Sequence, residues 1–404
     1  MSSVASASGS LRSDVKVIGL IGIGHFLSHL FQFIIPSLFL LIKEDFGISY
    51  SALGFSATAM FAAAGLMQVP AGFLVDRFGA KRVLIGGMTM LTGGILLAGL
   101  APDYWMFTIA LVIAGAGNSV FHPADFAILN ARIGPARIGH AFSVHGIGGT
   151  IGYASAPPLM LALGTAYGWR TAAMAAGIFG LVFTAILAAQ KDLQGATPQP
   201  RAAGAAAEVS EGFRTLLTGP VLMCAGFFVL SAFSLISLQS FAVPVMVNVY
   251  GVSAAAASAA LSGYLVGSIG GMFGGGFIVT HSKRFGLVAG ASVVISAAVL
   301  LGVALSDLKA GGLLAAMVVA GFFVGLMNPS RDTIIRQIAP AKSRGKVYGF
   351  VYSGLDIGAA TGPIIAGWLI DHGEPRLVFM ASAVALLLSA FTLVELSGKK
   401  AKED

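Results

Sequence analysis

The chain has 404 residues, of which 56% are hydrophobic and only 10% are charged, against about 25% charged in soluble domains. With a mean hydropathy of +0.88, this composition excludes a soluble globular protein and predicts an all-α membrane protein. The net charge of +7 is spread between apolar runs instead of forming one patch, so we expect no nucleic-acid partner.

Twelve apolar runs follow one another, and each is long enough to cross a bilayer. In chain order they are 16–42, 50–75, 82–100, 104–131, 138–163, 168–189, 215–247, 253–279, 285–306, 310–336, 345–370 and 375–396. The sixth and seventh runs are separated by a longer segment with prolines and acidic residues, which predicts a flexible cytoplasmic linker. The predicted parts are a tail at 1–15, a six-helix half at 16–189, the linker at 190–214, a second half at 215–396 and a tail at 397–404.

The positive charges predict the orientation of the chain. Nineteen of the 24 Lys and Arg residues fall on one side of the membrane when the twelve runs alternate in direction. Because basic residues concentrate in cytoplasmic loops, both termini are predicted to be cytoplasmic.

The fourth run contains the polar residues Asn118, His122 and Asp125 together with Pro123. Ionisable groups in hydrocarbon are costly, so they normally face a wet cavity or a partner. A shift of 206 residues brings back the same backbone plan, with Asn328 in place of His122 and Arg331 in place of Asp125. The matching pairs are Gly115 with Gly321, Pro123 with Pro329, Gly139 with Gly345, Gly148 with Gly354, Gly152 with Gly358, Pro157 with Pro363 and Arg170 with Arg376. This repeat indicates a transporter with two halves.

The loop after the second run reads GFLVDRFGAKR, and it resembles the signature of the major facilitator superfamily. The resemblance implies twelve helices in two pseudo-symmetric halves, a monomer without cofactors, and secondary transport by alternating access. It also implies a cytoplasmic conformational latch with Arg132 as the charge partner of Asp76; the alternative is a solvated turn that only sets topology. The latch residues would be Gly72, Asp76, Arg77, Gly79, Lys81, Arg82 and Arg132.

Two shorter segments, GHFLSH at 24–29 and SVFHPAD at 119–125, are similar to the fosmidomycin-resistance branch of bacterial exporters. This closer resemblance places the chain in a bacterial inner membrane. Substrate does not follow from it, because one fold serves many functions.

The first run carries His25, His29 and Gln32 at spacings that put them on one helix face. Imidazoles with an ordinary pKa near 6.5 suit proton exchange in a wet cavity. Two histidines one turn apart also suit a metal, but no Cys or Glu nearby offers further ligands, so we expect no metal site.

In the superfamily, helices one, four, seven and ten line the central cavity, which directs these polar groups inward. The expected substrate-binding residues are His25, His29, Gln32, Asn118, His122, Asn328, Arg331 and Tyr352. The expected proton-coupling residues are His29, His122, Asp125 and Asp356. Arg331 offers a planar fork to a carboxylate or phosphonate; the alternative is a structural ion pair with Asp125, Asp332 or Asp356.

The sequence has no Gly-x-x-x-x-Gly-Lys-Ser/Thr motif, which argues against ATP as the energy source. We therefore predict a proton-coupled transporter of a small organic anion. The first alternative is an exporter of amphiphilic drugs. The second alternative is a receptor without flux or an intramembrane enzyme. An enzyme would need a nucleophile, a base and an orienting group, which the sequence does not show, and a receptor would usually add a soluble domain, whereas both tails are short. The predicted partners are the substrate, protons and the lipid bilayer.

Overall fold

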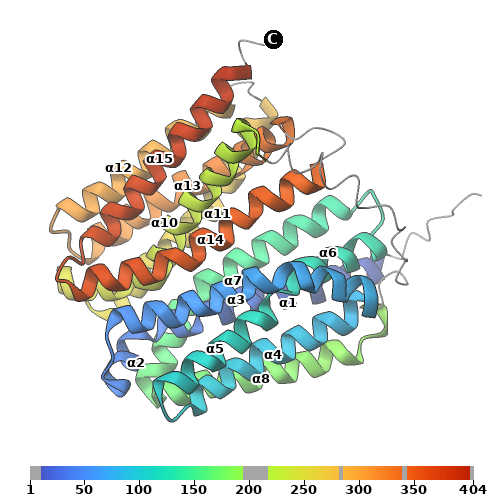
Figure 1. Ribbon diagram of the computed structural model, residues 1–404, viewed down its shortest axis with the longest axis horizontal. Coiled ribbons are helices and arrows are strands. Elements are labelled where there is room, and N and C mark those ends of the chain that lie inside the picture. Colours follow the sequence, from blue (N-terminus) through green and yellow to red (C-terminus); the bar gives the residue numbers. More distant parts are fainter. Residues whose placement is uncertain (1–10, 194–216, 282–284, 339–343, 401–404) are drawn as a thin grey trace, which may run out of the picture. The chain divides into compact units, whose positions relative to one another are not determined.

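The computed structural model describes residues 11–193, 217–281, 285–338 and 344–400, and every element in these ranges is a helix (Figure 1). Most of the predicted linker and parts of both predicted tails lie outside the described residues. Within them, ten helices are long and apolar enough to cross a membrane, and Leu377–Thr392 is a shorter apolar stretch. The chain is therefore a multi-pass membrane protein, whereas the count of twelve crossings stays a prediction.

The chain divides into two compact units. The first comprises Met1–Leu38 and Ala63–Arg201, and the second comprises Phe39–Ala62 and Ala202–Asp404. Helix α3 (Tyr50–Phe78) contributes to both units.

In the first unit, α1 packs against α7, and α4 packs against both α5 and α8. The Arg137 guanidinium lies 2.6 Å from the buried Asp14 carboxylate and ties the beginning of α7 to α1. A second link at this end joins Lys16 to Asp192 at 2.7 Å, and the hydrogen bond from Lys16 lowers the pKa of the Asp192 carboxyl. The helices of this unit are α1 (Leu11–Ser37), α4 (Ala80–Leu100), α5 (Tyr104–Asn118), α6 (Phe121–Arg132), α7 (Ile138–Tyr167), α8 (Trp169–Ala189) and the short η1 (Lys191–Leu193).

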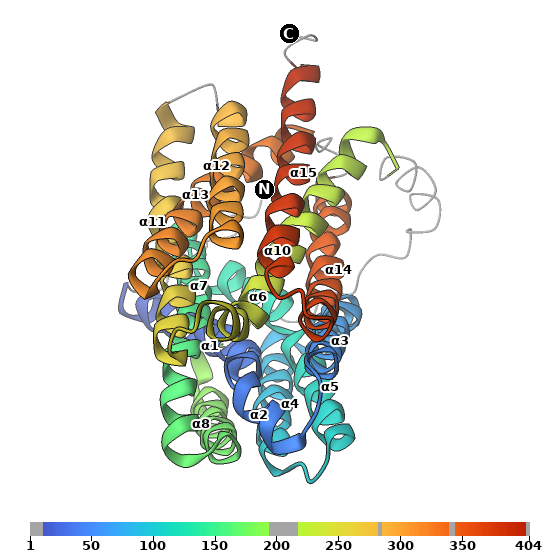
Figure 2. The same cartoon turned by 90° about the vertical axis from the view of Figure 1, so that its left-hand side faces the viewer.

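In the second unit, α10 packs against α14 and α15, and α12 packs against α13 and α15. Helix α13 also packs against α11, and the three helices α11, α12 and α13 form one group (Figure 2). The Asp371 carboxylate accepts hydrogen bonds from the amides of Tyr50 and Ser51 at 2.9 and 2.7 Å, so it caps the beginning of α3. The helices are α2 (Phe39–Phe46), α10 (Gly219–Tyr250), α11 (Ala254–His281), α12 (Phe285–Leu305), α13 (Ala310–Ile338), α14 (Arg344–Asp371) and α15 (Leu377–Lys400).

The packing of the two units repeats, because the α1–α7 contact of the first matches the α10–α14 contact of the second. A Cβ added at Gly148 would lie 2.9 Å from the Gly22 carbonyl oxygen, and one at Gly354 would lie 2.7 Å from that of Ala225. Gly148 and Gly354 are 206 positions apart, whereas Gly22 and Ala225 are 203 apart. The first helices of the two halves therefore correspond with an offset of 203.

Two arginines also occupy equivalent places. Arg170, at the beginning of α8, donates to the carbonyls of Gly99 and Ala101 at the end of α4. Arg376, just before α15, donates in the same way to the carbonyls of Ala304 and Ser306 at the end of α12. Carbonyls at helix ends have no partner within the helix, so each arginine satisfies groups that would otherwise need water.

The predicted run at 104–131 is not one helix, because it is interrupted between Asn118 and Phe121. Pro123 contributes to the break, because its ring crowds the carbonyl of Ser119 four residues earlier, but proline does not by itself interrupt a helix of this chain. The equivalent Pro329 lies inside the uninterrupted helix α13.

Candidate functional site

Four histidines and one aspartate gather in the first unit, and we call this group the histidine cluster. Three helices, α1, α6 and α7, supply it. Its members are His25 and His29 of α1, His122 and Asp125 of α6, and His145 of α7.

The centre of the cluster is the carboxylate of Asp125, which is 1% exposed. Its Oδ2 atom lies 3.1 Å from Nε2 of His145 and 3.7 Å from Nδ1 of His25. The imidazoles of His25 and His145 stack with their centroids 3.5 Å apart, and both are buried. The acid therefore has imidazole partners within its own unit.

His29 lies beside this centre, with its ring 4.3 Å from that of His25. On its other side it contacts the ring of Tyr153 at 4.1 Å. The Tyr153 hydroxyl donates a hydrogen bond of 2.9 Å to Oε1 of Gln32. Tyr153 of α7 therefore contacts two of the residues that were predicted to share a face of α1, His29 and Gln32.

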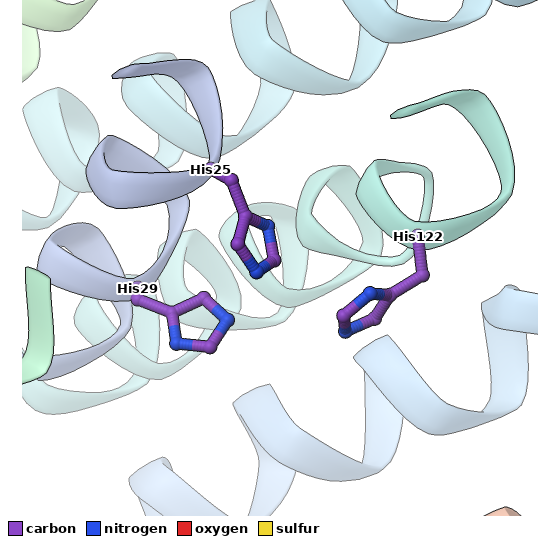
Figure 3. Close-up of side chains that lie close together, drawn as sticks. All are labelled: His25, His29 and His122. Atoms are coloured by element: carbon purple, nitrogen blue, oxygen red, sulfur yellow. The ribbon is translucent and has the colours of Figure 1, made fainter. Parts of the chain in front are cut away.

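His122 approaches from α6, and its ring centroid is 5.2 Å from that of His25. Its side chain is exposed, in contrast to the buried ring of His25. Figure 3 shows the imidazoles of His25, His29 and His122 directed toward a shared space. His122 is therefore the most exposed imidazole of the three.

Because Gly149 of α7 has no side chain, the imidazoles of His25 and His29 can pack against its backbone. A Cβ at this position would lie 2.9 Å from Nε2 of His25 and 2.9 Å from Cε1 of His29. Any larger residue would displace both rings. At the offset of 206 the second half carries Leu355 instead, so the same space is not available there.

The second unit places a different group at the equivalent backbone positions. The guanidinium of Arg331 lies over the ring of Phe228, 4.9 Å from its centroid. The ring of Tyr352 is 4.7 Å from the same ring. Phe228 corresponds to His25 at the offset of 203, and Arg331 corresponds to Asp125 at the offset of 206. A His–Asp pair in one half is therefore replaced by a cation–π pair in the other.

Three other predicted site residues are Asn118, Asn328 and Asp356, which belong to α5, α13 and α14. Asn118 is the last residue of α5, and its buried Oδ1 atom has no hydrogen-bond partner among the described residues. Asn328 and Asp356 are half-buried. The roles of all three stay predictions.

The predicted latch residues surround the connection from α3 to α4. Asp76 is exposed, and the described residues contain no ion pair between it and Arg132. Gly79 has a φ of 86°, which a residue with a side chain rarely adopts. Lys81 donates to the Ala188 carbonyl at 2.9 Å, near the end of α8. The latch role of Gly72, Arg77, Arg82 and the rest of this set stays a prediction.

Three residues that complete the site were not among those expected from the sequence. His145 is the partner of Asp125, Tyr153 contacts His29, and Gly149 provides space for the imidazoles. All three belong to α7 at steps of four residues, 145, 149 and 153, so they share one helix face. That spacing was the signal available in the sequence.

A helical membrane protein of two repeated halves, with a buried acid and imidazoles in one of them, belongs to the class of membrane transporters. Matches to the sequence profile described as Major Facilitator Superfamily cover residues 21–312 and 232–404. The chain belongs to the major facilitator superfamily. It is accordingly a transporter and not an enzyme.

Two similar proteins are named for drug resistance. The multidrug resistance protein MdtH of Salmonella arizonae is 29% identical over 360 residues, which cover 81% of this chain and 82% of that protein. The multidrug resistance protein B homolog of Mycobacterium tuberculosis is 34% identical over 146 residues, covering 35% of this chain and 27% of that protein.

Solved structures share the fold. A bacterial homolog of the human lysosomal transporter Spinster, in an inward-facing and occupied conformation, has a TM-score of 0.81 at 17% identity and covers 96% of this chain and 98% of its own. A variant of the nucleoside transporter NupG has a TM-score of 0.78 at 15% identity, with 94% and 99% covered.

Proposed function

We propose that this transporter exports small amphiphilic molecules from the cytoplasm and that proton influx drives the export. The observation that carries the proposal is the hydrogen-bonded pair of Asp125 and His145 in a membrane-spanning unit. The names of the similar drug-resistance proteins support the substrate class.

The proton-coupling role follows from the cost of an ionised group in a membrane. A carboxylate in hydrocarbon is costly unless it is paired or protonated, so its protonation state and its surroundings depend on each other. When Asp125 is ionised, it accepts a hydrogen bond from Nε2 of His145; when it takes up a proton, that acceptor loses its charge. Uptake and release of the proton therefore change the contact between α6 and α7.

The neighbouring residues hold this pair in position. His25 stacks on His145 and lies 3.7 Å from the Asp125 carboxylate, while Tyr153 and Gln32 fix the far side of His29. Because His122 is exposed, it gives the proton access to the buried centre. We assign His29 and His122 to proton transfer and Asp125 to proton storage.

We also propose an orientation of the chain in the membrane. The concentration of Lys and Arg on one side supports cytoplasmic termini in a bacterial inner membrane. Each chain holds both halves of the transport unit, so we propose a functional monomer.

The test replaces Asp125 with asparagine in protein reconstituted into liposomes. Transport of a fluorescent amphiphilic dye is measured under a pH gradient and in gradient-free exchange. We expect Asp125→Asn to lose gradient-driven transport and to retain exchange. Asp103→Asn is the matched control, because Asp103 caps α5 through the Met106 amide and asparagine caps equally well. If Asp125→Asn keeps gradient-driven transport, the coupling assignment is wrong.

A second candidate substrate class is a small organic anion. The arrangement that favours it is Arg331 over Phe228, with Tyr352 against the same ring. A guanidinium on an aromatic face can bind a carboxylate or phosphonate at two points while the rings contact an apolar body.

A further inference from the structure

Three imidazoles from two helices meet in the first unit, and two of them, His29 and His122, are those assigned above to proton transfer. His25 and His29 come from neighbouring turns of α1, and His122 comes from the beginning of α6 (Figure 3). One ring nitrogen of each lies within 4.8 Å of the ring nitrogens of the other two. This is the donor set of a three-histidine metal centre.

The spacing is close to what one metal ion needs. Zinc binds histidine nitrogens at about 2.0–2.1 Å in a tetrahedron, so that the nitrogens of its ligands are roughly 3.3 Å apart. Rotation of the side chains must therefore shorten the longest separation by at most about 1.5 Å. His122 is exposed and has room to make this rotation.

Two ring nitrogens of this group are buried without a hydrogen bond. The Nδ1 atoms of His25 and His29 have no hydrogen-bond partner among the residues that the structure describes. A buried polar atom without a partner costs about 1–3 kcal/mol, so such atoms usually serve a ligand, water or an ion.

The surroundings of His25 match those of a metal ligand. Its Nδ1 atom faces the Asp125 carboxylate at 3.7 Å, and metal-binding histidines commonly donate their second ring nitrogen to a carboxylate. Its Nε2 atom faces the space left by Gly149. Asp125 would then orient His25 and supply a negative charge near the ion.

A second group, His25, Asp125 and His145, also has its donor atoms within 4.8 Å of one another. Asp125 and His145 already contact each other at 3.1 Å, however. Only the set of three imidazoles contains His29, whose buried Nδ1 atom has no hydrogen-bond partner among the described residues, and this favours the three imidazoles as the ligands.

We infer that His25, His29 and His122 bind one transition-metal ion of the type that prefers imidazole, such as Zn²⁺ or Co²⁺, with a fourth position open to solvent. Nitrogen donors favour these ions over Mg²⁺ and Ca²⁺, which prefer oxygen. Metal binding rests on these three imidazoles and on no assumption about the exported substrate, and a bound ion would occupy nitrogens that the proposed proton transfer uses.

The experiment uses the full-length protein in detergent after removal of any affinity-tag histidines. Zn²⁺ affinity is measured by competition with a chromophoric chelator, and Co²⁺ is added separately to record its visible absorption bands. The main variant is His122→Asn, because the second half carries Asn328 at this position and the substitution suits the fold. His140→Asn is the matched control, since His140 is an exposed histidine of α7 outside the cluster.

We expect one equivalent of Zn²⁺ per wild-type chain and unchanged affinity in His140→Asn. In His122→Asn we expect affinity at least about tenfold lower, because even the loss of a residue that only supports a ligand costs roughly 10–100-fold. Gly149→Ala retains all three ligands but fills the space beside His25, so it should also weaken binding.

Two results would overturn the inference. The first is that His122→Asn and Gly149→Ala both bind Zn²⁺ with the same affinity as the wild-type protein. The other is a loss of affinity in His145→Asn while His122→Asn binds normally, which would assign the ion to the group around Asp125. Neither result depends on transport, so the proposed export function is judged separately.

Discussion

Replacement of Gly152 by alanine tests the close contact that brings α7 against the histidines of α1. A Cβ at Gly152 would overlap the carbonyl oxygen of Phe26 and lie 3.1 Å from the amide nitrogen of Leu30. Both are backbone atoms, so the helices must separate to accept the methyl group. Overpacking of this kind costs about 1–3 kcal/mol.

The helix preference of alanine acts in the opposite direction. Alanine is favoured over glycine in a helix interior by roughly 1 kcal/mol, which partly hides the packing cost. Gly146 of the same helix has nothing within 4 Å of an added Cβ, so Gly146→Ala should show the gain alone. The difference between the two variants therefore isolates the packing term, which we expect to be about 1–3 kcal/mol.

The assay is thermal unfolding of both purified variants in the same detergent, followed by tryptophan fluorescence. We expect Gly146→Ala to melt at a higher temperature than wild type, and Gly152→Ala to melt at the wild-type temperature or lower. Equal melting temperatures for the two variants would refute the close contact between α1 and α7.

Two further predictions concern arginines. Arg170→Ala and Arg376→Ala should each reduce the stability by about 1 kcal/mol and so lower the melting temperature, because each substitution leaves helix-end carbonyls without a donor. An unchanged melting temperature in both variants would contradict these caps. Arg331→Lys should weaken binding of aromatic carboxylates or phosphonates by about 1–3 kcal/mol with folding intact, because lysine lacks the planar fork. Equal affinity of wild type and Arg331→Lys in calorimetry would count against an anion site.

The sequence predicted the helical elements well, since hydropathy reports directly on burial in lipid. Each of the twelve predicted runs is helical over most of its length, although the first is divided at Leu38, between α1 and α2, and the fourth is divided before Phe121. Helix α7 is 30 residues long, yet it is not among the ten helices that qualify by composition. Its glycines, prolines and polar residues lower its hydropathy, and these same residues build the site.

The site could be predicted only where one helix supplies it. Helical spacing places His25, His29 and Gln32 together, and the structure brings Tyr153 to them from α7. Which residue contacts Asp125 depends on how α6 and α7 rotate about their axes, and spacing along one helix contains no such information. The expectation about metal had the same limit, because it considered only neighbours in the chain, whereas His122 is far from His29 in sequence.

The changing offset between the halves shows where this chain has tolerated changes in length since its duplication. The offset is 203 at the first helix of each half, 205 at the carbonyls that Arg170 and Arg376 bind, and 206 from Gly115 onward. One residue added within a helix would rotate everything beyond it by about 100° and turn His25 or Phe228 away from its partner. The offset therefore changes stepwise before the fourth helix of each half, while the faces that carry the chemistry keep their direction. Each half could then acquire its own side chains on a backbone that stayed the same.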